Sequence, residues 1–180
     1  VGSEVPRVVA INSGDSARVI SDKMNQSGAM INTRATTTLD AYVTGEGTFS
    51  YTLSSDSAPG LADVITVGGT AASKARTMVS EINARYSEHN VSASIQVDSS
   101  GNEFVRMYQD QGFNIRVDNF VTAGTTGLDF DGDGIAEVTG GTGKTAAVAG
   151  GKLVIDAPSS FLISSDDTSN TILQGTRASL

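Results

Sequence analysis

The 180-residue chain contains no cysteine and no tryptophan, and aromatic residues make up only 6% of it. Without cysteine the protein can form no disulfide bond, no thiolate zinc site and no cysteine nucleophile. A core with so few aromatic side chains must be filled by Val, Ile, Ala and Leu, which is typical of thin β layers. The 20 glycines provide turns between such strands.

Basic residues are also scarce, since 12 Lys and Arg stand against 20 Asp and Glu and give a net charge of −8. Nucleic acids and anionic membrane surfaces attract clustered Lys and Arg, and no two basic residues are adjacent here. No apolar run approaches the roughly 18 residues of a transmembrane helix. We therefore expect neither nucleic acid nor membrane as a partner. The chain begins at Val1 without a methionine or a signal peptide, so we expect a fragment or a processed form.

Residues 75–97 (ARTMVSEINARYSEHNVSASIQV) predict a helix followed directly by a strand. Apolar residues first recur at steps of three and four, as on one face of a helix: Ala75, Met78, Val79, Ile82 and Tyr86. After His89 the period changes to two, as on one face of a strand: Val91, Ala93, Ile95 and Val97. We interpret this stretch as a packing unit without evident chemistry.

An earlier stretch repeats this arrangement 58 positions upstream, where Ala17, Ile20, Met24 and Asn25 correspond to Ala75, Met78, Ile82 and Asn83. Asp15 or Ser16 suits the N-cap of the first helix, and Gly28 suits its end. A strand is expected before each helix, at residues 8–11 (VVAI) and 64–67 (VITV). An alternating strand is expected after the first helix too, through Ala29, Ile31, Thr33 and Ala35. The sequence therefore predicts an internal duplication with a period of about 60 residues.

Further strands are predicted from alternation and turn residues. Residues 41–43 and 48–53 flank the turn 44–47 (TGEG), which is typical of a β-hairpin. Residues 91–97, 103–108 and 113–117 predict an antiparallel meander covered by the helix at 74–88. Two late strands are expected at 152–155 and 161–164, and residues 165–180 form a polar exit segment.

We therefore predict an α+β fold of two repeated strand–helix–strand units with antiparallel β-sheets and a β-rich C-terminal section. Residues 1–57 form the first unit with the hairpin, and residues 58–121 form the second unit with the meander. Residues 122–180 contain a Gly/Asp-rich loop and the closing strands. A chain of this length buries roughly two-thirds of its unfolded surface and folds without disulfides or metals.

One acidic stretch, residues 129–137 (DFDGDGIAE), has the spacing of metal ligands. Carboxylates at alternate positions, followed by a glycine for a sharp turn, let one loop direct several oxygens to a hard cation such as Ca²⁺. The final bidentate Glu of an EF-hand is missing, because Gly140 stands at that position, so a solvated Gly/Asp turn is the alternative. The candidate calcium ligands are Asp129, Asp131, Asp133, the backbone carbonyl of Ile135, and Glu137.

Two other features resemble functional sites less well. Residues 138–145 (VTGGTGKT) mimic the end of a P-loop, but Val138 replaces the first glycine and no helix is expected after Thr145, so we predict a turn. His89 is the single histidine, at a predicted helix end where a cation is favourable. It has no Cys or second His to complete a zinc site, and we assign it no catalytic role. The four tyrosines are scattered, and nothing groups them into a sugar-stacking face.

Residues 10–39 and 65–104 resemble the hook-IN modules of bacterial flagellins, in which a short strand precedes a helix ending near Ile-Asn-Ala and a strand of the GVTA type follows. Ile82-Asn83-Ala84 matches the helix end, and Asn90-Val91-Ser92-Ala93 matches the strand start with Asn for Gly. The first unit departs from the pattern, with Met24-Asn25-Gln26 at its helix end. Residues 47–53 (GTFSYTL), 113–120 (FNIRVDNF) and the closing segment from Gly150 also resemble the variable central region of flagellins. The acidic stretch is not explained by this resemblance.

The resemblance implies a structural protein, the surface-exposed variable domain of a flagellar filament subunit, which is extracellular, antigenic and without catalysis or a required cofactor. Its expected partners are other copies of the subunit, which meet through terminal helices absent here, and host receptors, antibodies or glycans. Both chain termini should then lie close together. A hook-associated or cap subunit is a related alternative, and a secreted calcium-dependent binding or adhesion module is a different one. An enzyme ranks last, because only unorganised carboxylates and hydroxyls are available.

Overall fold

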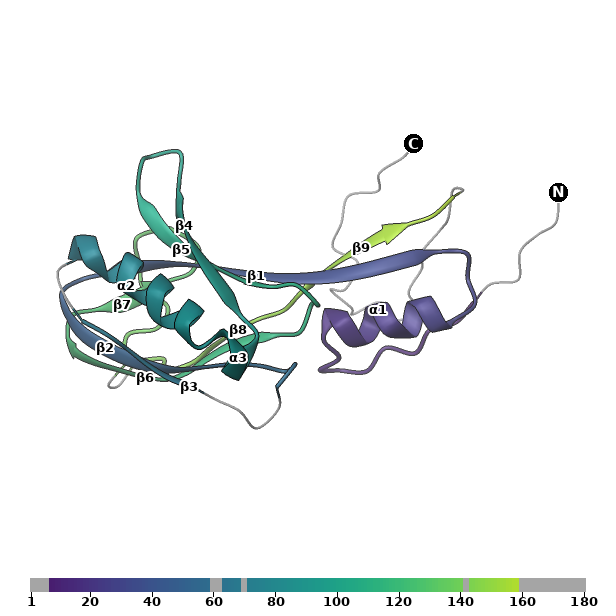
Figure 1. The fold of residues 1–180 in the computed structure, drawn as a ribbon, viewed down its shortest axis with the longest axis horizontal. Helices are drawn as coiled ribbons and strands as arrows, with labels where there is room; N and C mark the ends of the chain where they lie inside the picture. Colours follow the sequence, from purple (N-terminus) through teal and green to yellow (C-terminus); the bar gives the residue numbers. More distant parts are fainter. Residues whose placement is uncertain (1–6, 59–62, 69–70, 141–142, 159–180) are drawn as a thin grey trace.

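A computed structural model describes residues 7–58, 63–68, 71–140 and 143–158 (Figure 1). The predicted α+β class is confirmed, with three helices and nine strands in these ranges. In chain order they are α1 (Ala17–Gln26), β1 (Asn32–Thr44), β2 (Gly47–Ser55), β3 (Asp63–Val67), α2 (Ala71–Ala84), α3 (Tyr86–His89), β4 (Ser92–Val97), β5 (Glu103–Gln109), β6 (Ile115–Gly124), β7 (Gly127–Asp129), β8 (Ala147–Ala149) and β9 (Lys152–Asp156). None of these helices is both long enough and apolar enough to cross a membrane.

The strands form two antiparallel sheets. One has the order β4-β5-β1-β7, with β9 also paired to β1, and the other has the order β3-β2-β6-β8. The 13-residue strand β1 crosses the length of the molecule (Figure 1). Its partners follow one another along it: β9 at Asn32–Thr36, β5 at Thr37–Ala41 and β7 at Tyr42–Thr44. Both sheets take strands from all three predicted segments.

The core lies where the two sheets and α2 meet. Along β1 every second residue from Thr33 to Ala41 is buried, as the alternation in the sequence predicts. In the second sheet Phe49 stacks on Tyr51 and on Phe120, with ring centroids 5.9 and 5.3 Å away. Fully burying an aliphatic or phenyl side chain contributes about 1.5–3 kcal/mol. The core side chains with no exposed surface include Leu53, Val67, Met78, Ile82, Val91, Val105, Met107, Ile115, Val117 and Leu128.

The hairpin predicted at 41–53 is wrong, because β1 and β2 belong to different sheets. The turn between them carries the chain from one sheet to the other, and Gly45 and Gly47 adopt positive φ values of 65° and 116° there. A second crossover, from β6 to β7, lies against it. The Thr125 N–H donates to the Glu46 carbonyl at 3.0 Å, and the Glu46 N–H donates to Thr125 Oγ1 at 3.2 Å.

The predicted three-stranded meander is also wrong, since only its first two strands pair. β5 has β4 on one edge and β1 on the other, so neither edge is left for the next strand. β6 therefore starts at Ile115 in the other sheet, where it pairs with β2 and β8.

Residues 8–11 form no strand, and Val8 is 93% exposed. The matching strand of the second unit, β3, is confirmed. The predicted place of Tyr86 on the apolar helical face is wrong, because the helix breaks at Arg85 and leaves Tyr86 46% exposed at the start of α3. The predicted strand at 161–164, the exit segment and the proximity of the termini lie outside the described residues.

Each long helix is fastened to the strand after it by one asparagine. Asn25 donates from Nδ2 to the Thr33 carbonyl at 2.9 Å, and the Thr33 N–H donates to Asn25 Oδ1 at 2.8 Å. Asn83 makes the same two contacts with the backbone of Ala93, both at 2.8 Å. Thr33 and Ala93 are each the second residue of their strand. We call this contact the asparagine clamp, and its recurrence supports the predicted duplication.

Candidate metal centre

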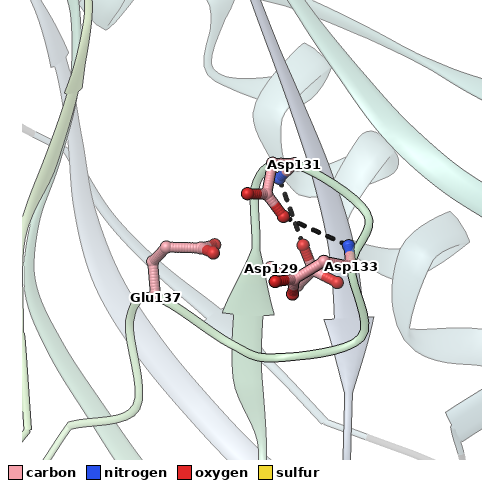
Figure 2. A group of neighbouring side chains, drawn as sticks. All are labelled: Asp129, Asp131, Asp133 and Glu137. Atoms are coloured by element: carbon pink, nitrogen blue, oxygen red, sulfur yellow. Dashed lines mark hydrogen bonds between the residues drawn. The ribbon is translucent and has the colours of Figure 1, made fainter.

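The acidic stretch forms a loop whose two ends are joined at its base. β7 pairs with β1, and Leu128 forms a bridge with Val138 through hydrogen bonds of 2.9 and 3.2 Å. This bridge therefore holds the two ends of the loop from Asp129 to Glu137 next to each other (Figure 2).

Asp129 is the anchor of the loop. Its side chain is only 2% exposed and accepts hydrogen bonds from three backbone N–H groups, those of Asp131 (3.1 Å), Gly132 (2.6 Å) and Gly134 (2.8 Å). Gly132 and Gly134 have positive φ values of 79° and 88°, which glycine adopts without steric cost. The glycines of the motif thus let the chain curl around this carboxylate.

Asp131 and Asp133 repeat the pattern nearer the solvent. Asp131 Oδ1 accepts from the Asp133 N–H at 3.1 Å, and Asp133 Oδ1 accepts from the Ile135 N–H at 2.7 Å. Glu137 lies at the other end of the loop, and its side chain points toward the aspartates (Figure 2). Its Oε2 accepts a hydrogen bond from the Phe130 N–H at 2.6 Å. Each carboxylate thus uses an oxygen to shape the loop.

The structure brings four of the five predicted residues together: one carboxylate oxygen each of Asp129, Asp131, Asp133 and Glu137 lies within 4.8 Å of the others. Ca²⁺ holds oxygens at about 2.4 Å, so two ligands on opposite sides of one ion stand about 4.8 Å apart. No Lys or Arg forms an ion pair with the four acids in the described part of the chain. This cluster can therefore hold a metal ion such as Ca²⁺. Ile135, the fifth, has a 71% exposed side chain and enters the network through its N–H.

Tyr42 packs against the loop at Gly132, and the sequence pattern does not identify it as part of the site. Gly132 packs so closely on it that a Cβ there would lie 3.1 Å from the ring. The ring stacks on Phe104 with centroids 4.9 Å apart. Burial, followed by the negative charges of Asp98, Asp40 and Asp129, raises the pKa of the Tyr42 phenol above its ordinary value.

Lys74 is a second residue of this region that the sequence pattern does not single out. It is fully buried, and its Nζ donates to the Gly45 carbonyl and to Thr126 Oγ1, both at 3.0 Å. Lys74 thereby connects α2 to both crossovers. Its partner Thr126 in the second crossover stands three residues before Asp129. The sequence spacing does indicate that Lys74 is buried, because it stands four and eight residues before Met78 and Ile82 on the apolar helical face.

The position of His89 at a helix end favours a cation, but the structure does not place one there. His89 is fully buried, and its Nδ1 accepts a hydrogen bond from the Val91 N–H at 3.0 Å. A ring nitrogen that accepts a hydrogen bond carries no proton. His89 therefore shapes the turn into β4.

The described residues of the P-loop-like stretch, 138–140 and 143–145, are joined by backbone hydrogen bonds that are typical of a turn, as predicted. The N–H groups of Thr139 and Gly140 donate to the Lys144 carbonyl at 3.1 and 3.4 Å. The short strand β8 follows instead of a helix, so these residues present no helix N-terminus to a phosphate.

A scan against protein-family models finds no match for this chain, and a search of curated proteins finds no relative.

Proposed function

We propose that this chain is the surface-exposed variable domain of a bacterial flagellar filament subunit, with a structural role in motility and no catalytic activity. The asparagine clamp carries the proposal. In the flagellin pattern a helix ends near Ile-Asn-Ala and a GVTA-type strand follows. Here Asn83 of that ending binds the backbone of Ala93, which stands at the alanine position of the strand start. The clamp gives a physical reason for both parts of the pattern to occur at a fixed spacing.

The first unit adds support where its sequence matches the pattern least. Its helix ends in Met24-Asn25-Gln26, yet Asn25 clamps Thr33 as Asn83 clamps Ala93. A domain that fastens a strand to each long helix by such local contacts suits an extracellular filament surface, where no ligand is needed for stability. Its partners are other copies of the subunit, through helices in the flanking sequence, and antibodies, host receptors or glycans at the outer surface.

The flanking gene sequence tests this proposal. A filament subunit needs long helices with apolar heptads on both sides of the domain, which build the filament core. Flanks without such helices, or with a membrane anchor or a different domain, contradict the proposal.

We propose a second function for the acidic loop, the binding of Ca²⁺, as in a calcium-dependent binding or adhesion module. The convergence of Asp129, Asp131, Asp133 and Glu137 favours it. Extracellular modules bind Ca²⁺ with dissociation constants of about 0.1–1 mM. With a constant of about 1 mM, 10 mM calcium stabilises the fold by about 1.4 kcal/mol, which raises Tm by about 3–6 °C for a chain of this size.

Thermal melts with and without 10 mM calcium test this second function. The double variant D131A/D133A, which removes two ligand side chains, should show no calcium shift, whereas D110A, which removes an exposed aspartate outside the loop, should retain it. The absence of a shift in the unmodified protein contradicts calcium binding. A glycan array with no binder in calcium or in chelator contradicts an adhesive role, even where calcium itself binds.

A further inference from the structure

In the described part of the chain, two core side chains, Thr37 and Gln109, each have a polar atom without a hydrogen-bond partner. Thr37 on β1 and Gln109 on β5 stand directly opposite each other in the antiparallel ladder, and neither has any exposed surface. Within the described chain, neither Thr37 Oγ1 nor Gln109 Nε2 makes a hydrogen bond. Buried polar atoms without partners are rare in folded proteins, and each one needs an explanation.

The orientation of the Gln109 amide is fixed by its other end. Gln109 Oε1 accepts hydrogen bonds from the N–H groups of Gln111 (3.0 Å) and Phe113 (2.9 Å). Turning the amide over would set its NH₂ group against two donors. Nε2 therefore stays on the side away from these two amides, where it needs an acceptor, and the Thr37 hydroxyl on the opposite strand can both donate and accept.

A third polar atom borders the same place. A Cβ added to Gly151 would lie 2.7 Å from Thr37 Oγ1 and 2.9 Å from the Gly112 carbonyl oxygen, so both oxygens stand next to Gly151. The Gly112 carbonyl already accepts from the Arg18 N–H at 3.0 Å and keeps a second lone pair. Ala17 also borders Gly151, since the same Cβ would lie 2.8 Å from Ala17 Cβ.

We propose that one water molecule is bound in the core between Gln109 and Thr37, a site that is independent of the function proposed above. The water accepts a hydrogen bond from Gln109 Nε2 and shares one with Thr37 Oγ1, and its remaining hydrogen is directed to the Gly112 carbonyl. Buried waters in proteins make about three such bonds to otherwise unpaired groups. A metal cation does not suit the site, because Nε2 is a donor only. The water thereby connects β1 to the end of β5 and to the turn at Gly112, whose carbonyl accepts from the Arg18 N–H at the start of α1.

A crystal structure at high resolution tests the site directly. The expected result is a water within about 3.2 Å of both Gln109 Nε2 and Thr37 Oγ1. A direct hydrogen bond between these two atoms, with no water between them, overturns the proposal.

Oxygen-17 relaxation dispersion provides a second test in solution, because it counts waters that stay bound for longer than the protein tumbles. T37V keeps the shape of the side chain and removes its hydroxyl, and we expect the dispersion amplitude to fall by the contribution of one water. T38V makes the same change at the exposed neighbour on β1 and should leave the amplitude unchanged. Equal amplitudes in all three proteins overturn the proposal.

Discussion

Replacing Asn83 by alanine should loosen the start of β4 and lower the stability of the whole domain. The side chain makes two hydrogen bonds to the backbone of Ala93, both at 2.8 Å. A typical hydrogen bond contributes about 1 kcal/mol net, so the loss amounts to about 2 kcal/mol. Alanine is the better helix former by about 0.5 kcal/mol, which offsets part of the loss. We expect N83A to lower the free energy of unfolding by about 1.5 kcal/mol, and Tm by about 3–6 °C.

Urea denaturation measures the total effect, and hydrogen exchange of the Ala93 amide locates it. The exchange of this amide should accelerate more in N83A than that of amides in β2 and β6. The variant N83D keeps the acceptor for the Ala93 N–H and removes the donor, so its loss should be about half as large. A variant N83A with unchanged stability and unchanged Ala93 exchange would refute the role of the clamp.

Three further substitutions address other parts of the structure. K74M removes the amino group that donates to the Gly45 carbonyl and to Thr126 Oγ1 and leaves the buried Thr126 oxygen unpaired, so we expect the free energy of unfolding to fall by about 2–4 kcal/mol, measured by urea denaturation. G112A places a Cβ 2.2 Å from the Cβ of Ala35 at a φ of 79° and should lower Tm more than G101A, which also has a positive φ but has open space around it. Hydrogen bonds from Asn102 hold the pKa of Asp98 below its ordinary value of 3.8. Asp98 therefore stabilises the fold above that value and loses this contribution as the pH falls below it. Acid titration should show a shallower loss of stability in D98N than in the unmodified protein, and parallel curves would contradict the assignment.

The local elements of this fold follow from the sequence, because their causes are local. Alternation predicts the buried face of β1, and the spacing of Ala75, Met78 and Ile82 predicts the buried face of α2. Ser16, one of the two expected caps, has its Oγ within 3.4 Å of the Val19 N–H. The four carboxylates of the loop converge because three of them are spaced two residues apart with glycines that permit the turns.

The sheet topology could not be predicted in the same way. A turn such as TGEG at 44–47 fits both a hairpin and a crossover between sheets, and the choice depends on the second crossover at Thr125, about 80 residues further along the chain. β6 alternates as a meander strand would, but β1 already occupies the free edge of β5. The buried positions of Lys74 and His89 likewise depend on groups far away in sequence.

Immunogold electron microscopy of cells that produce this protein tests its proposed place in a filament most directly. Antibodies raised against the folded domain should decorate extracellular filaments evenly along their length, because every subunit would present the domain on the surface. Gold particles confined to the cell body, with bare filaments beside it, would contradict the account.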